Sequence, residues 1–579
     1  MKIQFHRIDT NVVIGLLVRE FCCSGTDVSA KVLAMYADTR TPSMEPQWLA
    51  AGLSQGLMRG DVIEAKPTIY MMATALALYF NSRSRYYKSE KLMEALQLAA
   101  DGVARVQRKS GYIDYPCCNF FSAPDTSFCY KRLNDGYRLM KKYQDVADTT
   151  ILQKKYLAIM RMAAEAIRDG GFHTPNHRWG ICAALMQAAK LFADDTEFAK
   201  SLMDRTVLYL QEGIDGNSEG EYAERSTGNY NAVVNNAMMA MYQCSKDVKY
   251  LGYVERNLNM MMYYIEPNDM VFTQNSTRQD QGEEIFMDKY LYQYMYLIAY
   301  DGTDGFIKLT PEEHARFDGA AHQIIKGCAE TGRQAPNCLH LLMIYDKTLD
   351  YTFENCGFLK TYRKLFKEAG VLRVKKENYS YTVMKNRSAF LYFNVNGLEA
   401  YLKIGESYCE IRNFVPDEMD VQEGKTVLSH TARGWYYLPW KEKQNTSDWW
   451  QMDHKKRDLM ITSDLHTQVV ITELADGLEI SVDTDGLERL PLRMELCVPS
   501  ETTLENDHFC METVAGKSMV LSDDYVTMTK GLTSIEFGPG ACEHHFKGHY
   551  SGEEVNADGY TIYCNTYTPT KRVYTLKVK

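Results

Sequence analysis

Residues 150–171 read TILQKKYLAIMRMAAEAIRDGG, and residues 560–579 read YTIYCNTYTPTKRVYTLKVK. In the first stretch the apolar residues recur every three or four positions, which is the spacing of a helix with one buried face. In the second stretch apolar and polar residues tend to alternate, which is the spacing of a β-strand. Each stretch is typical of its half of the chain, so the change of period predicts the fold class.

The helical spacing extends from about residue 45 to residue 330. Turn residues interrupt it, for example at 169–171 (Asp-Gly-Gly) and at 301–302 (Asp-Gly), because Gly and Asp end helices and form turns. About ten helices joined by short turns pack as antiparallel hairpins. The chain has no strong short repeat, which disfavours a regular solenoid. We therefore expect a closed ring of helical hairpins, an (α/α) toroid.

From about residue 376 the apolar period is two, and runs rich in β-branched and aromatic residues are broken by Gly, Asn and Asp. Helices and strands are thus segregated along the chain, which excludes a doubly wound α/β fold. We expect an antiparallel β-sandwich. The predicted organisation of this α+β multidomain chain is a helical domain over 1–345, a linker over 346–375 and the β-sandwich over 376–579.

Composition and charge narrow the class of partner. The chain has 579 residues, more than one hydrophobic core usually serves. Lys and Arg number 65 against 75 Asp and Glu, a formal net charge of −10, which argues against nucleic acid as a partner. An anionic sugar needs only a few local cations and donors. The 40 Tyr, against 6 Trp, suit a sugar-binding surface and equally a helical core containing polar groups.

The N-terminal residues 1–21 include the apolar run VVIGLLV but lack the basic segment and small-residue cleavage site of a signal peptide. No stretch of about 20 apolar residues predicts a membrane span. The 15 Cys form no repeated CxxC pairs, which fits reduced thiols better than a disulfide framework. We expect a cytoplasmic protein without a membrane partner, or a secreted one if a leader has been removed. The oligomeric state is not indicated.

Residues 173–179, HTPNHRW, form a polar segment just before an apolar helix. Pro175 disfavours helix in the residue before it. A helix that begins there directs backbone N–H groups and a positive dipole end at an anion. Asn176, His177 and Arg178 add neutral and charged donors suited to a carboxylate. The alternative is an ordinary helix cap with solvent-exposed His and Arg.

Three further polar loops lie between predicted helices, at 119–126, 215–231 and 275–282. The loop over 215–231 comes one hairpin after the HTPNHRW segment, and Tyr230 opens the helix that follows it. Polar loops at such places often carry function. Four such loops at one mouth would make a saccharide cleft, although each alone reads equally well as loop and cap residues.

With these residues in place, the chain resembles the heparinase II/III-like and alginate lyase superfamily of polysaccharide lyases. The resemblance covers most of the chain in architecture, a helical toroid followed by a β-sandwich, but only a handful of residues. Asn176 and His177 match a pair that holds the substrate carboxylate. Tyr230, 53 positions after His177, matches a Tyr that acts on the C5 proton and on the leaving oxygen. The stretch 220–225 (GEYAER) and Arg278 resemble further parts of that cleft.

The resemblance implies a lyase that cleaves a uronic-acid glycosidic bond by β-elimination, without a cofactor. Asn176 and His177 would neutralise the carboxylate and stabilise the enolate-like state. Tyr has a reference pKa of about 10 and needs a cationic neighbour to act as a base. Tyr230 would act as both base and acid if both lie on one face of the sugar; otherwise His177 is the base and Tyr230 the acid. The expected substrate-binding residues are Asn119, Asp125, Arg178, Trp179, Glu224, Arg225, Arg278, His430, Arg433 and Tyr436.

Three of the expected substrate-binding residues, His430, Arg433 and Tyr436, come from residues 429–437, SHTARGWYY, in the β half. Related lyases close the cleft with β-sandwich residues, whereas the plainer interpretation is an aromatic strand. Some relatives also hold a structural zinc there. His430, Asp448 and His466 fit that pattern poorly, so we expect no metal site.

Two other classes of function remain open. A glycoside hydrolase on the same helical fold needs two carboxylates across the cleft, and a non-catalytic carbohydrate-binding protein needs none. The sequence does not indicate which uronate-containing glycan is the substrate, nor whether the enzyme cuts within the glycan or at its end. For the glycoside hydrolase alternative, the candidate catalytic carboxylates are Asp125, Glu219, Glu221, Glu224 and Asp280.

Overall fold

The computed structural model describes residues 65–84, 86–333, 336–409, 411–547 and 556–579. The N-terminal run and the helical spacing before residue 65 lie outside the described residues. The chain forms two compact units, a helical one that extends to Leu359 and a β unit that starts at Lys360 and also includes Glu266–Asn268. A helical part followed by an antiparallel β part was predicted, and this fold class is confirmed.

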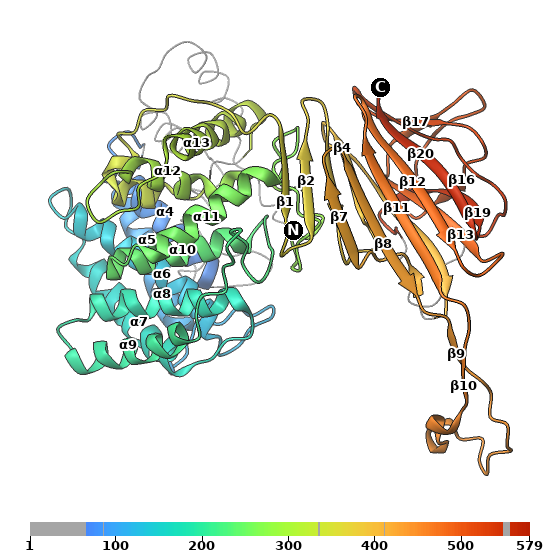
Figure 1. Cartoon of the computed structure of the whole chain (residues 1–579). Helices are drawn as coiled ribbons and strands as arrows, with labels where there is room; N and C mark the ends of the chain where they lie inside the picture. The colour runs from blue at the N-terminus through green and yellow to red at the C-terminus, as the bar shows by residue number, and fades with distance from the viewer. Residues whose placement is uncertain (1–64, 85, 334–335, 410, 548–555) are drawn as a thin grey trace, which may run out of the picture. The chain divides into compact units, whose positions relative to one another are not determined.

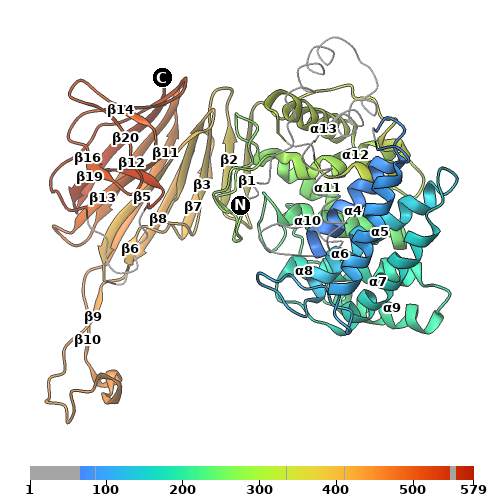
Figure 2. The same cartoon turned by 180° about the vertical axis from the view of Figure 1, so that it is seen from behind.

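The helical unit is built from hairpins (Figures 1 and 2). None of its described helices is long and apolar enough to cross a membrane. Its helices are α4 (Ala65–Phe80), α5 (Glu90–Val106), α6 (Ala123–Lys142), α7 (Thr150–Asp169), α8 (Pro175–Leu191), α9 (Thr196–Gln211), α10 (Tyr230–Ser245), α11 (Lys249–Met261), α12 (Leu291–Tyr300), α13 (Pro311–Thr331) and α14 (Leu339–Ile344), with the short 3₁₀ turns η1 (Met262–Tyr264), η2 (Met287–Tyr290) and η3 (Asp346–Thr348).

Alternate helices form two layers. The even-numbered helices α4, α6, α8 and α10 contact one another in sequence, while α5, α7 and α9 contact each other outside them. Consecutive helices joined as hairpins run antiparallel, so the inner helices run parallel and their N-termini lie on one rim. On the far side α14 contacts α4 and α6, and η3 contacts α12. The described helices thus close into a ring.

The inner helices are buried on most sides, which is why they are apolar nearly all round. In α8 the run from Gly180 to Ala184 is wholly buried. Gly180 allows a close approach to α6, because a Cβ there would lie 2.7 Å from the Phe128 ring. The outer helix α5 instead buries one stripe that includes Leu96 and Val103. Small residues on the inner helices therefore let the ring pack tightly.

A buried polar network holds one rim loop against the ring. The Asn235 amide donates to Asn257 Oδ1 at 2.7 Å and to Gln293 Oε1 at 2.8 Å, and the Tyr222 hydroxyl donates to Asn235 Oδ1 at 2.9 Å. Asn257 in turn donates to the Gly220 carbonyl at 2.8 Å. Each group is paired, as a buried polar network requires. The network fixes the loop before α10 and therefore the start of α10.

The β unit contains two nine-stranded sheets whose apolar side chains form one shared core, including Leu402 from one sheet and Ile480 from the other. Pairing among the described strands is antiparallel except between β16 and β19. The first sheet has β1 (Tyr362–Phe366), β2 (Val371–Lys375), β3 (Ser380–Met384), β4 (Leu391–Val395), β5 (Leu398–Tyr408), β13 (Pro491–Pro499), β19 (Gly559–Tyr567) and β16 (Ser518–Val520) in that order, with β6 (Ile411–Asn413) paired to β5.

The second sheet has β15 (Cys510–Glu512), β14 (Thr503–Glu505), β17 (Val526–Lys530), β18 (Thr533–Gly538), β20 (Thr570–Val578), β12 (Gly477–Asp485), β11 (Leu465–Glu473), β8 (Lys425–Ala432) and β7 (Glu418–Gln422) in that order. A separate ribbon pairs β9 (Trp435–Tyr437) with β10 (Leu459–Ile461), and the 3₁₀ turns η4 (Trp449–Gln451) and η5 (His454–Lys456) lie between them.

The division between the units differs in detail from the predicted boundaries. Residues 346–375, which we expected to be a linker, contain η3 and the first two strands, β1 and β2. These strands pair with each other, and β2 pairs with β3, so they belong to the first sheet. The polar residues of β1, such as Arg363 and Lys364, obscure its alternation because this edge strand is only partly buried.

Glu406 on β5 is a buried carboxyl group in the β unit. Burial raises its pKa to about 7 from an ordinary value of 4.5, although Thr467 donates a hydrogen bond that opposes the shift. Between pH 4.5 and 7 the folded protein keeps a proton that the unfolded chain has lost. Stability therefore falls as pH rises through this window and stays lower above it.

Replacing Glu406 with Gln should remove this pH dependence. At pH 8 the Glu406→Gln variant should unfold at higher denaturant concentration than wild type, with a gain of up to about 3 kcal/mol. At pH 4 the two should be nearly equal. The exposed Glu423→Gln serves as the control, and a similar pH effect in both variants would contradict the assignment.

Candidate active site

A cavity of about 960 Å³ lies inside the helical unit. This volume is near the upper end of the range for small-molecule sites, about 300–1,000 Å³. The cavity is lined by α4, α6, α8, α10 and α12, by the loop that contains Arg278 and Gln279, and by the segment from Pro336 to Leu341. It is therefore bounded by the inner helices of the ring.

The first turns of four inner helices gather at one level of this cavity. They contribute Lys66 from α4, Asp125 from α6, Asn176 and His177 from α8, and Tyr230 from α10. Proline stands in the first turn of both α6 and α8, where its fixed φ favours the start of a helix. The parallel inner layer thus brings together residues that lie far apart in the sequence.

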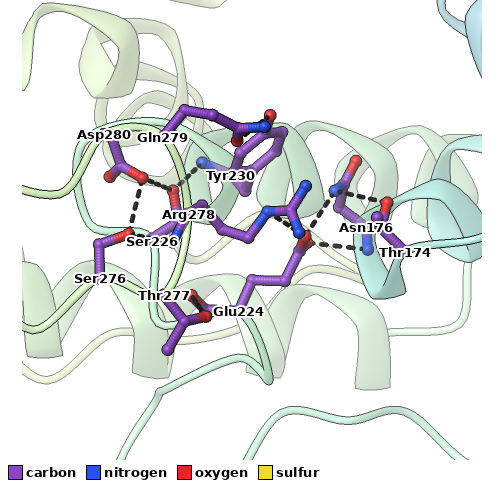
Figure 3. Close-up of polar contacts among 10 residues, drawn as sticks. All are labelled: Thr174, Asn176, Glu224, Ser226, Tyr230, Ser276, Thr277, Arg278, Gln279 and Asp280. Carbon is purple, nitrogen blue, oxygen red and sulfur yellow. Dashed lines mark hydrogen bonds and ion pairs between the residues drawn. The ribbon is translucent and has the colours of Figure 1, made fainter. Parts of the chain in front are cut away.

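Asn176 is fully buried and bound to Glu224 by both its backbone and its side chain (Figure 3). Its N–H donates to Glu224 Oε2 at 2.9 Å, and its Nδ2 donates to Glu224 Oε1 at 3.0 Å and to Thr174 Oγ1 at 3.3 Å. Asn176 Oδ1 has no partner among the described residues. A ligand donor can therefore satisfy it.

Glu224 lies behind Asn176 and does not line the cavity. Burial raises the pKa of its carboxyl group, although the two hydrogen bonds from Asn176 and the charge on Arg278 act in the opposite direction. Arg278 Nε lies 3.3 Å from Glu224 Oε1. One carboxylate thus holds the start of α8 and the arginine of a separate loop.

Tyr230 is held at the start of α10 by a second set of polar contacts (Figure 3). Its N–H donates to Ser226 Oγ at 2.8 Å, and its hydroxyl donates to Gln279 Oε1 at 3.2 Å. The Arg278 guanidinium carbon lies 5.3 Å from the centre of the Tyr230 ring. A phenol, an amide and a cation therefore meet at the cavity wall.

Asp280 joins the two loops that carry these groups. Its Oδ1 accepts from Ser226 at 2.8 Å and from Ser276 at 2.7 Å, and its Oδ2 accepts from the Gly228 N–H at 2.9 Å. Asp280 is 5% exposed, so these hydrogen bonds form in a desolvated environment where they are strong. They fix Tyr230 relative to Arg278.

The His177 imidazole is neutral at neutral pH. Burial, together with the neighbouring His173, Arg278 and Lys66, lowers its pKa to about 4, while Asp125 acts in the opposite direction. The ring packs edge-on against Phe128 and His173. Nδ1 has no partner among the described residues, so the ring can still bind a ligand through this nitrogen.

Asp125 and Lys66 form an ion pair beside His177. Lys66 Nζ lies 2.7 Å from Asp125 Oδ1, and Asp125 Oδ2 accepts from Asn119 at 3.0 Å and from Ser122 at 2.7 Å. Burial alone would lower the pKa of Lys66, but the Asp125 carboxylate raises it to about 12. Burial raises the pKa of Asp125 less than Lys66 and the hydrogen bonds lower it. Both groups are therefore charged at neutral pH.

Of the residues predicted from sequence, the structure brings together Asn119, Asp125, Asn176, His177, Tyr230 and Arg278 in the cavity wall. Arg178 and Trp179 are directed elsewhere: Arg178 pairs with Glu212 at 3.0 Å, and the buried Trp179 donates to Asp215 at 2.5 Å. Arg225, at φ +49°, lies 3.5 Å from Glu221. Neither Arg178, Trp179 nor Arg225 lines the cavity, because each pairs with an acid of its own rim.

Three of the predicted residues belong to the β unit: His430 lies near the end of β8, Arg433 lies between β8 and β9, and Tyr436 lies in β9. His430 Nδ1 lies 3.5 Å from Asp417, and Tyr436 is more than half exposed. Within the described residues no group of three or more His, Cys, Asp or Glu side chains is placed to hold a metal ion. In particular His466 Nδ1 pairs with the Thr431 hydroxyl at 2.8 Å.

Several polar residues of the cavity wall were not predicted from the sequence, and some of them lie deeper along the inner helices. Gln187 stands as an isolated polar residue in the apolar run GICAALMQAAKLF. That pattern would have been the signal, because a polar residue in a helix buried on all sides must face a cavity or a partner. The missed polar residues are Lys66, Lys131, Arg132, Asp135, Gln187, Asn236, Gln243, Asp288 and Lys289.

The sequence matches no protein-family model, and no curated protein matches it. Solved structures do match the fold. Xanthan lyase from Paenibacillus aligns with a TM-score of 0.54 and 9% identity over 98% of this chain, which spans 60% of that enzyme. Heparinase III aligns with a TM-score of 0.54 and 11% identity, and the alignment covers 99% of this chain and 92% of the heparinase III chain. The chain therefore shares the fold of these two polysaccharide lyases. At such identities the likeness concerns the fold alone.

Glu224→Ala should test whether this carboxylate positions Asn176. The variant leaves the buried Asn176 N–H without its acceptor, which should cost about 1–3 kcal/mol of unfolding free energy. Glu212→Ala is the control, because its exposed carboxylate pairs with Arg178 and such pairs contribute about 0–1 kcal/mol. Equal losses in the two variants by denaturant unfolding would contradict this role.

His177 should also affect stability at acidic pH. Its folded pKa of about 4 lies below its ordinary value of 6.5, so the unfolded chain takes up the proton first as pH falls. Wild type should lose stability between pH 6.5 and about 4 relative to its value at pH 7. His177→Gln should lose less over the same window in thermal melts. An identical acid profile in both proteins would show that His177 is not buried in its neutral form.

Proposed function

We propose that this protein is a polysaccharide or oligosaccharide lyase that cleaves a uronic-acid glycosidic bond by β-elimination. The observation that supports it is the meeting of Asn176, a neutral His177 and Tyr230 at one level of a single cavity. A fold shared with xanthan lyase and heparinase III agrees with this reading. An anionic uronate-containing glycan is the proposed substrate.

The first requirement of the reaction is a neutralised carboxylate, because removing the C5 proton builds further negative charge on that group. We assign this role to Asn176 and His177, which would donate hydrogen bonds to the carboxylate oxygens. For Asn176 the donor is the Nδ2 hydrogen that now makes the long contact with Thr174 at 3.3 Å. The hydrogen bond to Glu224 holds the Asn176 amide in place while the other Nδ2 hydrogen changes its acceptor from Thr174 to the substrate carboxylate.

The second requirement is a base for the C5 proton and an acid for the leaving oxygen. A histidine whose pKa is about 4 is a weak base at neutral pH, which favours Tyr230 for both transfers. The Tyr230 hydroxyl lies at the cavity wall, and Arg278 supplies a nearby positive charge. Elimination on one face of the sugar follows from this assignment.

The hydrolase alternative needs two carboxylates free to act across a cleft. Of the five acids that the sequence suggested, only Asp125 lines the cavity, and it is paired with Lys66 at 2.7 Å. Two other acids line it as well: Asp288 pairs with Arg333 at 3.3 Å, and Asp135 lies 3.6 Å from His340. Glu224 and Asp280 hold loops together through hydrogen bonds. The geometry therefore favours elimination over hydrolysis.

The direct test is to mix the purified protein with a panel of uronate-containing glycans and follow near-ultraviolet absorbance. Elimination leaves a C4–C5 double bond conjugated with the carboxylate, so absorbance should rise with the correct substrate. New reducing ends without a rise in absorbance would identify a hydrolase. Binding without any product would identify a carbohydrate-binding protein.

Tyr230→Phe should lower turnover by about 10²–10⁴-fold, the usual contribution of a positioned acid or base. Its thermal midpoint should remain close to wild type, because among the described residues the hydroxyl makes a single hydrogen bond, to Gln279. Tyr87→Phe is the matched control, since Tyr87 is exposed and does not line the cavity. Turnover by Tyr230→Phe within threefold of the Tyr87→Phe rate would reject the assignment.

A further inference from the structure

The cavity continues below the level of Asn176 and Tyr230. On α8 the next polar lining residue is Gln187, eleven residues after Asn176, and on α10 the lining extends to Gln243, thirteen residues after Tyr230. A helix rises 1.5 Å per residue, so these side chains originate about 16–20 Å along the ring axis. Lys131 on α6 lies at an intermediate level, six residues after Asp125. The cavity is long enough for more than one sugar residue.

Among the described residues of this lining, Lys131 is the cation without a hydrogen-bond or ion-pair partner. Lys66 is paired with Asp125 and Arg278 with Glu224, whereas Arg132 contacts His340. Lys289 donates to Asn229 Oδ1 at 2.8 Å. Within the described part of the chain, no carboxylate lies within ion-pair distance of Lys131. Burial lowers its pKa to about 8, although Asp135 opposes this shift. An anion beside the ammonium group would offset this cost of burial.

Gln187 is the second unmatched group, on the helix next to α6. It is 6% exposed, it lines the cavity, and its Oε1 has no partner among the described residues. A buried acceptor without a donor is unfavourable, because it has lost its hydrogen bond to water. A ligand hydroxyl that donates to Gln187 would remove this cost. Gln187 and Lys131 therefore require complementary groups, a donor and an anion.

We propose that Lys131 and Gln187 form a second subsite inside the ring, which binds a sugar residue that carries both a carboxylate and hydroxyl groups. This rests on the proposed function, since the upper level would hold the uronate that is cleaved. The substrate is then acidic on at least two residues, one at Asn176 and His177 and one at Lys131. The charge of the lining agrees with an acidic substrate: the lining contains five Lys and Arg but three Asp, although the whole chain has a net charge of −10.

The test compares two trisaccharides, one with a carboxylate on every residue and one with a single uronate. Calorimetric titrations use the Tyr230→Phe background, in which the proposed mechanism is blocked. Lys131→Met should weaken binding of the fully acidic trisaccharide by about tenfold or more, as loss of a buried charge partner does. It should leave binding of the single-uronate trisaccharide within about twofold. Lys154→Met, on the exposed side of α7, should change neither.

Lys131→Gln guards against misfolding, because it keeps a polar side chain of similar length and should show the same selective loss. Equal effects on the two trisaccharides, no effect on either, or no binding of the acidic trisaccharide would overturn the subsite. Turnover by wild type is followed separately. If the Lys131 variants selectively lose binding of the acidic trisaccharide but wild type forms no unsaturated product, the subsite stands and the lyase function is rejected. If wild type forms the product but the variants show no selective loss of binding, the lyase function stands and the subsite is rejected.

Discussion

The geometry of the site depends on one buried carboxylate. Glu224 accepts from both the backbone and the side chain of Asn176, and it lies 3.3 Å from Arg278. Three segments that are distant in sequence therefore share one acceptor, and none can shift without leaving a buried donor or charge unpaired. Such loss is costly where water cannot replace the partner. The rim is ordered because its polar groups satisfy one another.

Much of the fold follows from the sequence, because period and turn residues are local signals. The two-part organisation and the rim residues Asn176, His177 and Tyr230 are of this kind, since polar clusters at helix starts are readable. The strand at 362–366 (YRKLF) was missed because an edge strand need not alternate cleanly. Lys131 was missed for another reason: a charged residue in a helix usually faces solvent, and only the packing shows that this one lines a cavity.

The charges in the cavity have distinct roles. Lys66 with Asp125 and Arg278 with Glu224 are paired within the protein and fix positions. His177 is kept neutral by burial, so it adds hydrogen bonding without adding charge. Lys131 is left to meet a charge from outside. Two of the five lining cations are paired with carboxylates, and all five lie inside the ring. The site can therefore bind an anion without a strongly basic surface, which agrees with the acidic composition of the chain.

The parallel inner layer has a consequence for the movement of ligands. Each helix carries a partial positive charge at its N-terminus and a partial negative charge at its C-terminus. Because α4, α6, α8 and α10 point the same way, their dipoles add to a potential that falls along the cavity. An anionic sugar is attracted to the rim and repelled with depth. The positive charge of Lys131 offsets this repulsion part-way along the cavity. An anionic fragment that loses its contact with Lys131 is repelled towards the mouth of the cavity.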